Sequence, residues 1–147
     1  MFDKIDDLLN RHGCQGTFII LMPEYRPDVA RGIANHLGFE FFDYRQEIML
    51  EFAREAHRLT LDQLSKTLAE KSEQSALIAF NVEALLAAKP ENERKHWLLN
   101  CLQIAKENPV VIPLAIYIDE LPIGDSRILD LRHSKLDEQT LVSRLIN

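Results

Sequence analysis

The chain has 147 residues, 46% of them hydrophobic and 27% charged, and its formal net charge is −6. This length and composition favour one folded domain over residues 1–147 and exclude a disordered chain. The acidic balance also argues against autonomous binding to duplex nucleic acid, because such binding needs a basic surface.

Neither a targeting segment nor a membrane-spanning segment is recognisable in the sequence. Residues 1–7 are too acidic for a signal peptide, and no apolar run approaches the roughly 20 residues that span a bilayer. The two cysteines, Cys14 and Cys101, form neither a disulfide framework nor a metal-binding pattern. We therefore expect a cytoplasmic protein with free thiols and no membrane contact.

The first part of the chain alternates helical and strand patterns. An apolar stripe predicts a first helix, and Pro27 and Gly38 suit the start and the end of another. The expected elements are a helix over 1–11, a strand over 17–22, a helix over 27–38, a strand over 39–42 and a helix over 45–59. In the last of these, the apolar face is expected to hold Ile48, Met49, Phe52, Ala53 and Ala56.

The alternation continues through the rest of the chain. Thr60 and Gln63 form a capping-box pattern that opens a helix lined by Leu61, Leu64 and Leu68. The further elements are a strand over 76–80, a helical turn over 82–86, a helix over 91–107, a strand over 110–118, a weaker strand over 127–131 and a helix over 137–147.

Continuous apolar strands separated by helices predict an α/β fold. We expect a three-layer, doubly wound sandwich in which about five mostly parallel strands carry helices on both faces. Ligands of such sheets bind outside the carboxyl ends of the strands. A site is therefore expected to draw on residues 22–26, 43–45, 81–83 and 118–120.

The turn between the first strand and its helix stands where a phosphate-binding loop belongs. It reads Pro-Glu-Tyr-Arg and holds neither glycine nor Gly-Lys-Ser/Thr. Arg26 takes the lysine position, and Pro27 at the Ser/Thr position cannot bind Mg²⁺. Glu24, Tyr25 and Arg26 form either a residual anion site or a connecting loop in which Arg26 is solvated or pairs with Glu24.

Residues 76–83 stand where a Walker B strand is expected. Asn81 holds the position of the metal-binding Asp, and Glu83 lies two residues further on. One interpretation is a relic nucleotide site, and the favoured one is that Asn81 caps the following turn. A competing Walker B pattern ends at Asp119 and Glu120, a weak alternative for a metal site.

Other chemistry has little support in the sequence. The five histidines do not pair at metal-ligand spacing, so no metal site is predicted from them. Cys101 lies in an apolar stripe and is expected in the core. Cys14 lies in a turn beside Gly13, with only Arg11 and His12 as basic neighbours, and no catalytic residue is assigned.

Three segments resemble the core of P-loop NTPases of the AAA+/RecA branch. They are the turn after the first strand, the helix end at Gly38 and the run Ala-Phe-Asn-Val-Glu-Ala-Leu-Leu over residues 79–86. The layout and the stretch from 97 to 112 are also similar to the small P-loop protein of type 3 BREX phage-defence systems. This resemblance implies a sheet in the order 5-1-4-3-2 and a role as a subunit of a larger bacterial complex.

The scaffold of a P-loop protein is preserved in the predicted elements, while the residues that would bind the ligand are missing. This combination favours a non-catalytic, degenerate P-loop-fold subunit with an interaction or regulatory role. The resemblance to the BREX protein places that role in phage defence. We expect protein partners, with a homo-oligomer as one option, and no cofactor. Glu24, Tyr25, Arg26, Asn81 and Glu83 are then vestigial nucleotide-site positions. The alternative is an ATPase that uses Arg26 in place of Lys, with Asp119 or Glu120 for Mg²⁺ and ATP as its ligand.

Overall fold

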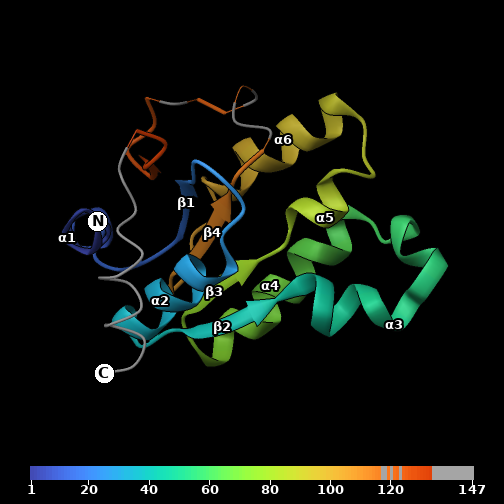
Figure 1. Ribbon diagram of the computed structural model, residues 1–147, viewed down its shortest axis with the longest axis horizontal. Coiled ribbons are helices and arrows are strands. Elements are labelled where there is room, and N and C mark those ends of the chain that lie inside the picture. The colour runs from blue at the N-terminus through green and yellow to red at the C-terminus, as the bar shows by residue number, and fades with distance from the viewer. Residues whose placement is uncertain (117–118, 120, 123, 134–147) are drawn as a thin grey trace.

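A five-stranded parallel sheet forms the centre of the fold (Figure 1). The computed structural model describes residues 1–116, 119, 121–122 and 124–133. The strands follow one another across the sheet in the order β2-β3-β4-β1-β5, which confirms the expected order read from its other edge. Their bounds are β1 Thr17–Leu21, β2 Glu40–Asp43, β3 Leu77–Phe80, β4 Val110–Leu114 and β5 Ile128–Asp130.

Helices cover both faces of this sheet, as expected for a doubly wound sandwich. Successive strand residues point to opposite faces, so Phe18 and Ile20 of β1 belong to one buried cluster, with α1 and α2. Ile19 and Leu21 belong to the other, with α4, α5 and α6. The helix bounds are α1 Phe2–Asn10, α2 Pro27–Leu37, α4 Leu61–Gln74, α5 Glu83–Leu86 and α6 Glu91–Cys101.

The predicted helix ends at Gly38 and Thr60 are confirmed. Gly38 follows α2 in the left-handed region, with φ of 70°, and its N–H binds the Asn35 carbonyl. At the start of α4, the Gln63 N–H donates to Thr60 Oγ1 at 3.1 Å, and the Thr60 N–H donates to Gln63 Oε1 at 2.7 Å. This reciprocal pair fixes where the helix begins.

The prediction of one helix over residues 45–59 is wrong. The segment is a π-helical turn (Arg45–Met49), a short α3 (Leu50–Phe52) and a 3-10 helix (Ala53–Arg58). Ala53 has φ of 46°, which an α-helix cannot contain. Phe52 is 46% exposed, so the expected buried face is also incomplete. Spacing alone does not separate a π turn from an α turn, because both place apolar residues three to five positions apart.

Two other predicted elements are shorter than expected. The helix expected over 91–107 ends at Cys101, and Ala105, which the longer helix would have included, is exposed. The chain needs residues 102–109 to return to the start of β4, and Pro109 disfavours a helical Asn108. The strand expected over 110–118 ends at Leu114. The helix expected over 137–147 lies outside the described residues.

The helices of the described part of the chain are too short or too polar to cross a membrane.

Candidate functional site

A pocket of about 290 Å³ lies at the carboxyl edge of the sheet. It is lined by residues that follow four different strands: Tyr25 after β1, Arg45 after β2, Asn81 and Glu83 after β3, and Ile116 after β4. Three of the five predicted site positions, at 25, 81 and 83, therefore come together. The pocket occupies the crevice where open α/β sheets bind their ligands.

Tyr25 forms an exposed aromatic wall of this pocket. Its side chain is 56% exposed, and its ring packs on Phe80 with 5.3 Å between the ring centroids. Phe80 in turn packs on Phe41, whose ring carries the Arg31 guanidinium at 4.2 Å from its centroid. The position of Tyr25 is therefore supported by a chain of stacked side chains, while one face of its ring remains open.

Asn81 joins the ends of β3 and β2. It is 8% exposed, and its Nδ2 donates to Asp43 Oδ1 at 2.9 Å. The expected side-chain cap on the following turn is absent, so that prediction is wrong. The backbone of Asn81 is in the left-handed region, with φ of 63°, and in this conformation its side chain points toward β2. The amide and Asp43 lie 38 positions apart in the chain, and no local pattern indicates that they pair.

Glu83 is bound to the end of β4. Its Oε1 accepts the N–H of Ala115 at 2.7 Å, and its Oε2 accepts the N–H of Ile116 at 3.0 Å. Burial raises the pKa of Glu83, and the two backbone hydrogen bonds partly offset this effect. Both carboxylate oxygens hold the β4 turn in place, which is a structural use of the residue.

Arg26 precedes α2 and is bound by two carboxylates. Its Nε and one terminal nitrogen donate to the two oxygens of Asp28 at 2.9 and 2.7 Å, and its other terminal nitrogen lies 3.4 Å from Glu24. The hydrogen bond from Arg26 is the main reason that the pKa of Asp28 is lowered. The expected contact with Glu24 is confirmed, and the closer partner is Asp28.

The carboxylates expected for a metal do not gather in the described residues. Asp119 is exposed and lies beyond the end of β4, while Glu120 lies outside the described residues. No group of three His, Cys, Asp or Glu side chains suitable for a metal occurs among the residues that the structure describes.

Cys101 is buried as expected, and burial raises its pKa to about 12, which keeps the thiol protonated.

Fold and pocket together define a class: a doubly wound α/β protein with a parallel sheet and a carboxyl-edge pocket. Comparison of the chain with family models, curated proteins and solved structures gives no match. The resemblance to P-loop NTPases and to the BREX protein therefore stays a prediction.

Proposed function

We propose that the protein is a non-catalytic interaction or regulatory subunit of a larger bacterial complex, built on a degenerate P-loop-like scaffold. One observation carries the proposal: side chains at the predicted nucleotide-site positions are already bound by other groups of the same chain. Arg26 is neutralised by Asp28 and Glu24, and both oxygens of Glu83 are bound to the backbone. A phosphate beside Arg26 meets two carboxylates, which repel it.

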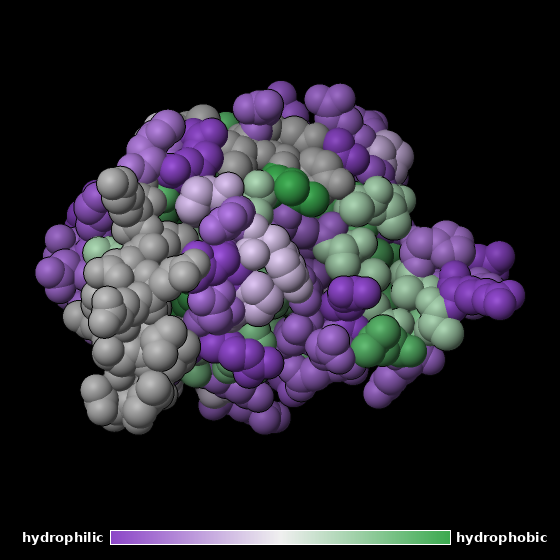
Figure 2. All heavy atoms as spheres, in the orientation of Figure 1, coloured by the Kyte–Doolittle hydropathy of each residue, from purple (hydrophilic) through white to green (hydrophobic). Residues whose placement is uncertain are grey.

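The resemblance to the small P-loop protein of type 3 BREX systems makes a phage-defence complex the proposed setting. Large exposed apolar side chains support a role in protein binding. Leu50 is 55% exposed and Phe52 is 46% exposed, both in α3 of the irregular segment between β2 and α4. Figure 2 shows hydrophobic surface gathered over this segment, on the right of the view. By contrast, α1 buries its apolar residues against the sheet.

A purification from the native host tests the proposal. The tagged protein is expected to recover a stoichiometric partner, and the double variant Leu50→Lys, Phe52→Lys is expected to lose it. Glu51→Lys is the matched control, because Glu51 is exposed between the two apolar residues and is charged. Recovery of the protein without any stoichiometric partner contradicts the proposal.

The alternative, a nucleotide-binding ATPase, makes a separate prediction. Nucleotide at about 100 times its dissociation constant adds roughly 2.7 kcal/mol of stability, a shift of several degrees in the unfolding midpoint. The subunit proposal predicts no shift with millimolar ATP and Mg²⁺. A shift that disappears in Arg26→Ala, together with ATP turnover, favours the ATPase.

A further inference from the structure

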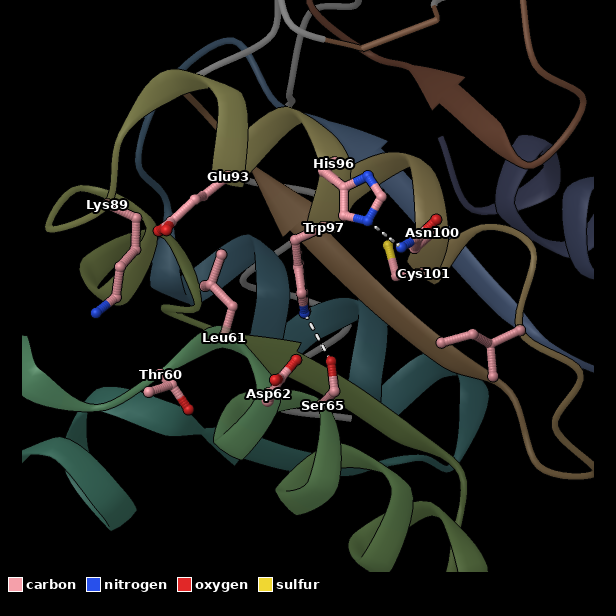
Figure 3. Close-up of a pocket in the computed structure, with 11 residues that line it drawn as sticks. Thr60, Leu61, Asp62, Ser65, Lys89, Glu93, His96, Trp97, Asn100 and Cys101 are labelled. Atoms are coloured by element: carbon pink, nitrogen blue, oxygen red, sulfur yellow. Dashed lines mark hydrogen bonds between the residues drawn. The ribbon is translucent and has the colours of Figure 1, made fainter.

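A second pocket, away from the carboxyl-edge pocket, lies between α4 and α6. It is a groove of about 630 Å³, a size typical of sites for small molecules. Figure 3 shows Trp97 at its centre, with Ser65 facing it from α4. Trp97 Nε1 donates to Ser65 Oγ at 2.7 Å, so the indole ring is fixed between the two helices.

A small inner chamber adjoins this groove. Ser65, Trp97, Cys101 and Ile104 line both spaces. The chamber reaches the first residue of β1 and the segment before β4, and its free volume is about 20 Å³. That is enough for one water-sized group. The groove and the chamber therefore lie next to each other with these four residues in common, and the chamber is the one nearer the amino edge of the sheet.

One polar group of the chamber is buried without a partner, and a half-buried lysine lines the chamber with it. Thr17 is 2% exposed, and its hydroxyl has no hydrogen-bond partner among the described residues. Lys106 also lines the chamber and is half-buried, and Glu73 is the acidic residue near enough to act on its ammonium group electrostatically. Burial lowers the pKa of Lys106. A hydroxyl donor and a partly desolvated cation together favour an anionic oxygen as their common partner.

The two ends of the groove differ in charge. The outer end holds Asp62 and Glu93, in the first turns of α4 and α6. Lys89, at the same end, donates to the His57 carbonyl at 3.0 Å. The outer end therefore holds two carboxylates and one ammonium group, and an anionic head group is favoured at the inner end, beside Lys106. The apolar surface between them, which includes Leu61 and Ile104, suits a hydrocarbon body.

We propose that this groove binds a small amphiphilic carboxylate, with one carboxylate oxygen in the inner chamber between Thr17 and Lys106 and the apolar body along Trp97. The inference does not depend on the function proposed for the carboxyl edge, because no residue lines both pockets.

Trp97 provides a direct signal for the test, because it is the one tryptophan of the chain. The purified full-length protein is titrated with sodium octanoate and, separately, with 1-octanol, which has the same chain length and no charge. Octanoate is expected to change the Trp97 fluorescence in a saturable way and to bind at least about tenfold more tightly than octanol, as a charged hydrogen bond implies.

Variants test the head-group assignment. Lys106→Met is expected to abolish the preference for octanoate over octanol, and Thr17→Val to weaken octanoate binding several-fold. Val matches the shape of Thr and removes an unsatisfied hydroxyl, so the variant is expected to fold, which circular dichroism checks. Lys95→Met is the control, since Lys95 is an exposed lysine of α6 outside the pocket.

Each other result overturns the proposal. The absence of saturable binding shows that the groove does not take this class of ligand. Equal affinities for octanoate and octanol, or an unchanged preference in Lys106→Met, show that the chamber does not bind the carboxylate. An effect of Lys95→Met as large as that of Lys106→Met shows that octanoate binds the charged surface of α6 instead.

Discussion

The carboxylate of Glu83 and the backbone N–H of Ala115, 32 positions apart, meet at 2.7 Å and join the start of α5 to the end of β4. The second oxygen binds the next N–H, of Ile116, at 3.0 Å. Glu83, which stands two places after the position predicted for a Walker B Asp, thus fixes a turn. Each oxygen of this carboxylate therefore accepts one backbone N–H from the end of β4.

Removal of the Glu83 carboxylate is expected to destabilise the fold. Glu83→Ala leaves two N–H groups, one of them partly buried, without their acceptor, and we expect a loss of about 1–3 kcal/mol in the free energy of unfolding. Glu83→Gln keeps one acceptor and is expected to lose less. Urea denaturation measures both variants. Equal stability of wild type and Glu83→Ala contradicts a structural role for this carboxylate.

The raised pKa of Glu83 predicts a pH dependence. Because the folded state holds the proton more tightly than the unfolded state, whose pKa is near 4.5, this group stabilises the fold most below that value. Its contribution falls as the pH rises through the folded pKa. The stability of wild type minus that of Glu83→Gln should therefore decrease between about pH 4 and pH 7. An increase over this range contradicts the burial effect.

Substitution of Asn81 should separate its two roles. Asn81→Ala removes the hydrogen bond to Asp43 and puts at φ of 63° a residue that tolerates the left-handed region less well than Asn, and we expect a loss of about 1–3 kcal/mol. Asn81→Gly accepts the same backbone and should recover part of that loss. Thermal unfolding ranks the three proteins. If the glycine variant is as unstable as the alanine variant, the left-handed backbone is not a source of strain.

The pairing of Arg26 predicts a titration change at Asp28. Arg26→Ala removes the hydrogen bond that chiefly lowers the pKa of Asp28, so this pKa should rise toward 3.8. The stability supplied by a lowered pKa is present above pH 3.8 and is lost as the pH falls through the folded pKa. The Asp28 carboxylate is exposed to solvent, so the effect of the pair on stability should be small, although the Arg26 side chain is only 14% exposed. NMR titration of the Asp28 carboxyl measures the shift, and Arg11→Ala is the control, expected to leave it unchanged.

Tyr44→Phe is expected to keep or raise stability. The Tyr44 side chain is fully buried in the cluster beneath α4, α5 and α6, and its hydroxyl has no partner among the described residues. Removal of an unsatisfied buried hydroxyl should add about 1 kcal/mol. Tyr25→Phe is the control, since Tyr25 is exposed and should change stability by less than about 0.5 kcal/mol. A clear loss in Tyr44→Phe indicates that its hydroxyl is bound in solution.

Local rules account for the elements that were predicted correctly. The capping box at Thr60 and Gln63 and the left-handed Gly38 act within a few residues, so the sequence displays them directly. The irregular segment between β2 and α4 was missed, because its shape depends on the positive φ of Ala53, a residue type that favours helix. Its conformation therefore reflects tertiary context.

In the candidate site, too, some features follow from local sequence and others from the tertiary structure. Strand periodicity was enough to predict that residues 25, 81 and 83 lie at one edge of the sheet, since parallel strands end on the same side. The pairs that give these residues their roles, Asn81 with Asp43 and Glu83 with Ala115, span 38 and 32 positions and appear only once the strands are aligned.

The sequence by itself determined the alternation of strands and helices, the sheet class and a glycine-free turn after the first strand, because apolar spacing and turn chemistry act locally. Only the tertiary structure decided that Arg26 and Glu83 are bound by their own chain and that Thr17 and Lys106 share a buried chamber. Hydrogen bonds and burial between distant segments depend on how the elements pack, and no local pattern encodes that packing.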